Sequence, residues 1–245
     1  MVEAGASSKQ LHLLPDFYLA DAFIFSVQVA ASVLAFIVAF HFYKFYRITG
    51  FVYLLGLGIG FSFITFAQVL LAADVWLEFH PELFNLLFWL RLLSLSYGFS
   101  FLAVSYYSKS KEEDKTLMLR IAALSAVPIM VMIAVVILAP PVLDFPPYNQ
   151  VDEYFRVFIL VVLAYVFRST LVSIVAHGRK ELMYIPAAYA LLWLGQFSGL
   201  IYSIDGGISA FIALHSAKLA GLLLFAIVMS QVVRGKTVRI TETEA

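Results

Sequence analysis

The sequence of 245 residues contains no cysteine and few charged residues. Without cysteine, disulfides, thiolate metal sites and cysteine nucleophiles are all excluded. Charged residues make up only 13% of the chain, whereas 62% of it is hydrophobic, which is a larger apolar share than soluble domains carry. Its 16 Lys and Arg residues balance its 16 Asp and Glu residues, so the chain lacks the basic footprint of a nucleic-acid-binding protein. We therefore expect an integral membrane protein that does not bind nucleic acid.

The chain also lacks a polar stretch long enough to form a separate soluble domain. Instead it contains apolar segments of about 20 residues or more, the length that crosses a bilayer as a helix. Because unpaired backbone groups are costly in hydrocarbon, these segments predict helices joined by short loops. The fold class is all-α, a single bundle of seven transmembrane helices, followed by a short, disordered cytoplasmic tail at 234–245. The seven predicted helices are 17–42, 51–73, 83–107, 117–138, 154–175, 183–204 and 208–233.

The charged residues are segregated between alternate loops. One set of loops and the carboxyl-terminal tail hold most of the basic residues, among them Lys44, Arg47, Lys109, Lys111, Lys115, Arg120, Arg179, Lys180, Arg234, Lys236 and Arg239. The opposite loops hold the carboxylates Asp74, Glu78, Glu82, Asp144, Asp152, Glu153 and Asp205. The positive-inside rule then places the amino terminus outside and the carboxyl terminus in the cytoplasm. We expect a multi-pass protein of the cell membrane.

The last span carries two ionisable residues in an otherwise apolar run. Lys218 lies near mid-membrane, where insertion scales give a cost of about 2.5–3.5 kcal/mol, so it should face the protein interior. His215 precedes it by three residues and shares its helical face. Arg91 lies roughly two turns into the third span, at a similar depth. These three residues predict a ligand pocket in the outer half of the membrane; the alternative is that they only bond neighbouring helices.

Polar and aromatic residues at similar depth complete the predicted pocket, namely Ser94, Tyr97, Tyr189, Trp193 and Gln196. Since Asp21, Asp152 and Glu153 are expected nearer the membrane surface, Lys218 should lack a carboxylate partner. A lysine amine in such surroundings can serve as a hydrogen-bond partner, a proton carrier or a Schiff-base amine.

Two pairs of small residues predict close helix packing. Gly56 and Gly60 in the second span, and Gly195 and Gly199 in the sixth, have the small-xxx-small spacing that lets helices approach each other. No metal-spaced His/Glu cluster, phosphate-binding glycine loop or carboxylate pair is found within the spans. We therefore expect a protein that is not an enzyme and has no metal site.

Several motifs resemble the seven-helix membrane sensor modules of bacterial and archaeal signalling proteins. They are His215-x-x-Lys218-x-x-Gly221 in the last helix, Trp89-x-Arg91 in the third, and the aromatic and basic stretch 42–47 before a glycine-rich second helix. The resemblance implies ligand sensing and signal transduction to a cytoplasmic output protein. Because only a short polar tail follows the last span, that partner would be a separate chain.

A second resemblance is to the microbial rhodopsins, in which a lysine of the seventh helix carries retinal. Ser216-Ala217-Lys218, the pair Tyr189 and Trp193, and Arg91 follow that pattern. The chain departs from it where those proteins carry acids, at Leu214 and Ser94. We therefore rank a retinal-binding photoreceptor with Lys218 as the Schiff base second.

A third alternative is a membrane subunit of a respiratory or transport complex. Haem would need two histidines at one depth, and His80 with His215 is the only candidate pair, so we rank haem last. The leading hypothesis is a receptor-like sensor that binds a small apolar or anionic ligand and signals to a cytoplasmic partner.

Overall fold

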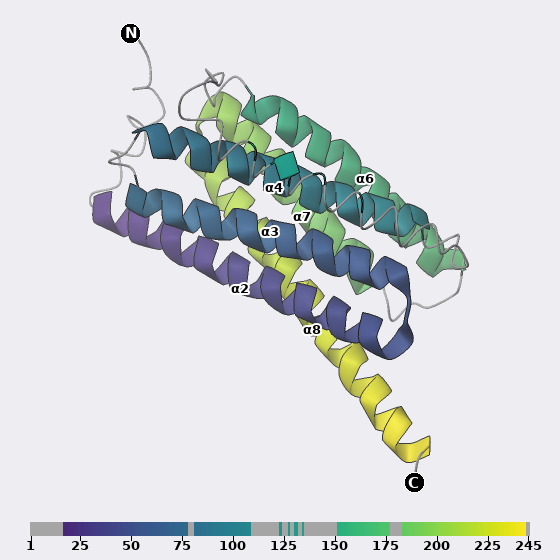
Figure 1. The fold of residues 1–245 in the computed structure, drawn as a ribbon. Coiled ribbons are helices and arrows are strands. Elements are labelled where there is room, and N and C mark those ends of the chain that lie inside the picture. The colour runs from purple at the N-terminus through teal and green to yellow at the C-terminus, as the bar shows by residue number, and fades with distance from the viewer. Residues whose placement is uncertain are drawn as a thin grey trace.

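Six long helices form the part of the protein that the structure describes. This computed structural model describes residues 17–77, 81–108, 151–176 and 183–243, together with five positions between 123 and 134. All six helices are long and apolar enough to cross a membrane, so the chain is an all-helical, multi-pass membrane protein. They are α2 (Phe17–Thr49), α3 (Val52–Leu77), α4 (Pro81–Ser108), α6 (Asp152–Ala176), α7 (Tyr184–Asp205) and α8 (Ile208–Thr243) (Figure 1).

The six helices close into a ring, in the order α2, α3, α4, α6, α7, α8 and back to α2. Contacts at two levels, Lys218 with Gln28 and Ser230 with His41, show that α2 and α8 run parallel. Helix α6 runs antiparallel to α7, and α4, which meets the start of α6 and the start of α7 at its two ends, runs parallel to α6. Consequently α2, α4, α6 and α8 all begin at one end of the bundle, here called the entry end, and α3 and α7 finish there. We call the opposite end the exit end.

Helices α4 and α6 do not form a hairpin, because α4 finishes at the exit end and α6 begins at the entry end. The predicted span 117–138, between them in the sequence, lies outside the described residues, except for five helical, exposed positions: Ala123, Val127, Met130, Val131 and Ala134. The seventh helix and the orientation of the termini therefore stay predictions.

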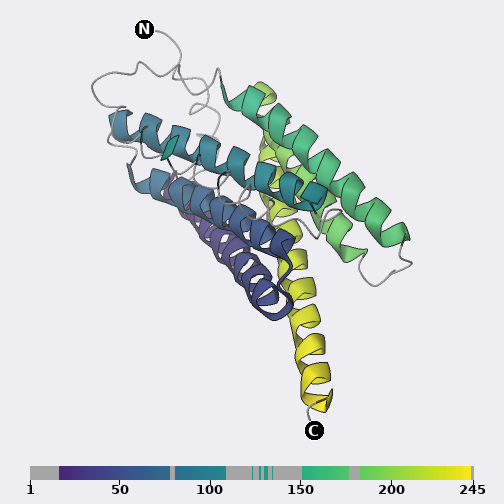
Figure 2. The same cartoon turned by 45° about the vertical axis from the view of Figure 1, so that its right-hand side comes forward.

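Helix ends differ from the prediction mainly at the exit end. Two of the connections contain a glycine with positive φ, Gly50 (72°) between α2 and α3 and Gly206 (65°) between α7 and α8. The Gly206 N–H donates to Tyr202 O at 2.9 Å, which caps α7. Where a disordered tail was expected from 234, α8 instead continues to Thr243 and projects beyond the other helices (Figures 1 and 2).

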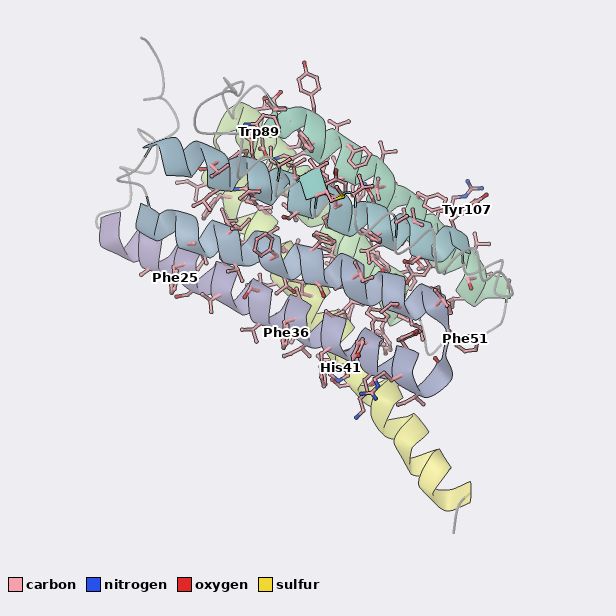
Figure 3. All side chains as sticks on the ribbon, in the orientation of Figure 1. Phe25, Phe36, His41, Phe51, Trp89 and Tyr107 are labelled. Carbon is pink, nitrogen blue, oxygen red and sulfur yellow. The ribbon has the colours of Figure 1, made fainter. Side chains whose placement is uncertain are left out.

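The outer surface of the bundle is apolar, as lipid contact requires. Phe36 is 60% exposed and points away from α2 (Figure 3). Tyr107, 60% exposed near the end of α4, lies where an aromatic side chain can anchor a helix at a membrane interface (Figure 3). Exposed aromatics on a soluble domain would favour aggregation, whereas here they meet acyl chains.

Aromatic side chains from five helices form a continuous row through the interior toward the exit end. Phe42 of α2 stacks on Phe61 of α3 at 5.6 Å, and Phe61 meets Phe225 of α8 edge-on at 5.3 Å. Phe225 contacts Tyr189 of α7 at 4.6 Å, and Tyr189 contacts Tyr106 of α4 at 5.8 Å. The Tyr189 hydroxyl donates to the Tyr106 hydroxyl at 3.2 Å, which satisfies a polar group in an otherwise apolar layer. This aromatic row closes the bundle core.

Glycines set the closest helix approaches. A methyl group on Gly60 would lie 2.8 Å from the Leu102 side chain and 2.9 Å from Gly98 O, so α3 and α4 touch through Gly60 and Gly98. Against α2, α3 is closest at Gly58, where a methyl would meet Ala39 O at an ordinary 3.5 Å. Gly56, the other predicted packing residue, is buried in α3.

Gly60→Ala should destabilise the protein by about 1–3 kcal/mol, because an added methyl would overpack a backbone contact that cannot move aside. Gly58→Ala is the matched control in the same helix. It should be neutral or stabilise by up to about 1 kcal/mol, since Ala has the higher helix propensity. Thermal unfolding in detergent measures both, and equal effects of the two substitutions would contradict the α3–α4 contact.

Candidate functional site

Lys218 joins three helices near the entry end. Its side chain on α8 is buried, with 8% of the residue exposed. The Nζ atom donates to Gln28 Oε1 on α2 at 2.7 Å and to Gln68 Oε1 on α3 at 3.0 Å. The predicted inward orientation of this lysine is therefore what the structure has. The sequence did not predict these partners: two neutral amide oxygens, and no carboxylate among the described residues, accept hydrogen bonds from the amine.

Two glycines of α7 make room for this part of the site. A methyl on Gly195 would lie 3.2 Å from both Lys218 N and Leu214 O, so the backbone of α8 passes directly over Gly195. A methyl on Gly199 would collide with the guanidinium of Arg156, which comes from α6. Of the predicted packing pair, one glycine thus admits a helix and the other admits an arginine side chain.

A carboxylate lies between two arginines of α4 and α6. Arg156 Nε donates to Asp152 Oδ2 at 2.5 Å, and Arg91 Nη2 of α4 lies 3.9 Å from Asp152 Oδ1. The Asp152 side chain is 4% exposed, and the two arginine side chains are 11% and 13% exposed. Asp152, which was expected near the membrane surface, is buried within the protein, because the first turn of α6 is packed against Arg91 of α4.

The site as a whole carries an excess of positive charge. Arg91 and Arg156 lie within electrostatic range of Lys218, and Lys218 and Arg156 lie within electrostatic range of His215. One carboxylate, Asp152, accompanies these cations. We call Arg91, Asp152, Arg156, His215 and Lys218 the cationic cluster.

Two buried nitrogens of the cationic cluster have no hydrogen-bond partner among the described residues. They are Arg91 Nε and His215 Nδ1. His215 is 6% exposed, and its ring meets Phe211 edge-on at 4.4 Å, which leaves the polar edge unsatisfied. Buried polar atoms are nearly always paired, so each such atom needs an explanation.

The other predicted pocket residues do not gather around Lys218. Ser94 is buried and donates to Leu90 O of its own helix at 2.7 Å. Tyr97 packs against Phe63 and lines a groove of about 390 Å³ between α4 and α6. Gln196 is half-buried on α7. These residues therefore do not extend the cationic cluster into one continuous pocket.

The predicted aromatic residues also have separate roles. Tyr189 belongs to the aromatic row and contacts Phe225. Phe225 lies on α8 two helical turns after Lys218, toward the exit end, so Tyr189 is far from the amine. Trp193 donates from Nε1 to Leu160 O on α6 at 3.1 Å and stacks on Phe197 at 5.4 Å. The pair that resembles the rhodopsin pattern thus packs against the neighbouring helices.

The structure adds four residues that were not predicted as part of the site. Gln28 and Gln68 are single amides in apolar runs, and Asp152 and Arg156 lie one turn apart at the start of α6. A polar residue inside a span tends to face the bundle, so the two amides carried a usable signal. The sequence does not reveal which helices meet, and hence which partner each of them finds.

Known proteins give no guide to the function. No protein-family model, no curated protein and no solved structure matches the chain. Within the described ranges, no three His, Cys, Asp or Glu side chains come together as metal ligands would. His80, one of the two histidines considered for haem, lies outside those ranges. The two family resemblances thus remain hypotheses.

Asp152→Asn should destabilise the protein by about 3–5 kcal/mol, because it leaves two buried guanidinium groups without their counter-charge. The neighbouring Glu153 is exposed, so Glu153→Gln is the control and should change stability by less than about 0.5 kcal/mol. Thermal unfolding in detergent, with gluconate as the only added anion, gives both values. Equal stability of the two variants would show that the arginines do not depend on Asp152.

Proposed function

We propose that this protein is a non-enzymatic membrane receptor that binds a small anion at the cationic cluster and passes a helix movement to a cytoplasmic partner. The observation that carries the proposal is the charge imbalance of the cluster. Two permanently charged side chains, Arg91 and Arg156, share one buried carboxylate, Asp152, and Lys218 lies within electrostatic range of both arginines. The positive-inside pattern puts this place in the outer half of the membrane, within reach of an external ligand.

An uncompensated charge in a low-dielectric interior is costly, so a bound anion would stabilise the cluster. The arginines remain charged under all ordinary conditions, which makes the positive field permanent. Arg91 Nε and His215 Nδ1 are free to take part in hydrogen bonds to such a ligand. The positive charge and the two free nitrogens of the cluster favour an anionic ligand. The sequence alone had allowed either an apolar or an anionic one.

Helix α8 is the element best suited to carry a signal. It holds His215 and Lys218 at the cluster and then runs the length of the bundle to project beyond its exit end (Figure 2). Near the exit end it touches α2 again, where Ser230 Oγ lies 3.4 Å from His41 Nε2. A ligand that pulls Lys218 toward Arg91 would thus shift α8 against α2, and the projecting end would present that shift to a partner.

Anion binding should appear as a rise in the unfolding temperature of the purified protein in detergent. Chloride, nitrate, acetate and sulfate are the probes, added at constant ionic strength against gluconate. A probe at about 100 times its dissociation constant stabilises by about 2.7 kcal/mol. Arg91→Gln should remove most of this shift, since it takes away a guanidinium of the cluster.

Arg168→Gln is the matched control, because Arg168 is an exposed arginine on α6, remote from the cluster in sequence. It should keep the full shift. If no probe raises the unfolding temperature, or if Arg91→Gln responds as strongly as Arg168→Gln, the cluster is not an anion site.

An absorption spectrum separates this proposal from the retinal and haem alternatives. We expect no visible band after purification or after addition of all-trans retinal, because Tyr189 and Trp193 are committed to contacts away from Lys218. A band that hydroxylamine bleaches, and that Lys218→Ala lacks, would instead establish a retinal Schiff base. A Soret band would favour haem and membership of a larger complex.

A further inference from the structure

The hydrogen bonds of Lys218 suggest how the anion is bound, an inference that rests on the proposed function. We propose that the anion enters together with a proton, which Lys218 takes up as the anion binds. The protein would then respond to an anion and a proton jointly. The step breaks an O–H bond of water and forms an N–H bond with the lone pair of Nζ. The hydroxide stays in the bulk solution, and the negative charge of the anion balances the charge that the proton brings.

The number of acceptors around Nζ fits a neutral amine. A neutral lysine has two N–H groups and an ammonium has three. Among the described side chains, two oxygens accept from Nζ, one from Gln28 and one from Gln68. Both are amides, so neither supplies a negative charge. The third N–H of an ammonium would need another acceptor, and an anion in the cluster supplies it.

The charges that face Lys218 from the surrounding helices also favour a neutral amine. The polar partners from α2 and α3 are the uncharged glutamines, and α7 contributes the backbone at Gly195. Arg91 from α4 and Arg156 from α6 are both cations, and His215 lies one turn before Lys218 on α8. Asp152 is engaged by the two arginines rather than by the lysine.

An anion bound among these groups reverses the balance at Lys218. Like charges and burial both disfavour the ammonium, whereas an opposite charge within about 4–6 Å favours it. Anion and proton together add no net charge to the buried cluster. Each therefore lowers the free energy of binding the other, and by linkage the coupling is reciprocal.

The test measures the apparent dissociation constant of the four probe anions as a function of pH. Their own charges do not change between about pH 6.5 and 9.5, whereas a lysine amine can titrate there. If a proton is bound with the anion, the dissociation constant should rise by up to about tenfold per pH unit in the upper part of this range. Lys218→Arg keeps a permanent cation, so its affinity should not vary with pH.

Two further variants assign the proton. Lys44→Arg changes an exposed lysine and should keep the wild-type slope. His215→Gln should also keep it; if this variant alone is flat, the proton belongs to His215 and the assignment to Lys218 is wrong. Should Lys218→Arg fail to fold, proton uptake by the wild-type protein, followed with a pH indicator in unbuffered solution, replaces it and should approach about one proton per anion.

The two proposals can fail separately. Wild-type binding that does not vary with pH, or that takes up no proton, would overturn the coupling and leave the anion site intact. Absence of binding by all four probes at every pH would overturn the proposed function itself.

Discussion

The buried amine of Lys218 is the interaction on which the arrangement of the helices depends. A lysine in hydrocarbon costs several kcal/mol unless polar groups surround it, so α8 can occupy the bundle only with this residue facing Gln28 and Gln68. These two bonds tie the last helix of the chain to the first two, which closes the ring. One side chain thus connects helices from the beginning and the end of the described sequence.

The interior of the bundle is polar toward one end and aromatic toward the other. The cationic cluster occupies the part near the entry end, whereas the aromatic row, from Phe42 through Phe225 to Tyr106, fills the part toward the exit end. Close-packed aromatics resist deformation, because an interior at crystal-like density has little free volume. A change at the cluster would therefore be transmitted as movement of a whole helix rather than absorbed by local rearrangement.

Sequence reasoning predicted those features that depend on one helix at a time. Apolar runs located the six described helices, and the cost of a charge in lipid predicted that Lys218 faces inward. It did not predict contacts between helices: the terminal position of Asp152 indicated a place near the membrane surface, but not that Arg91 of α4 would pair with it. Tyr189 and Trp193 were assigned to the pocket by depth alone, since a sequence fixes depth better than the direction in which a side chain points.

The choice of amides around Lys218 determines what the site can recognise. A carboxylate at the position of Gln28 or Gln68 would pair with the lysine, hold it charged and cancel one positive charge of the cluster. Amide oxygens accept the same hydrogen bonds with no charge of their own. They therefore position the amine while leaving the field of Arg91 and Arg156 largely uncompensated. The side chains that bind Lys218 provide no counter-charge, so a ligand can supply it.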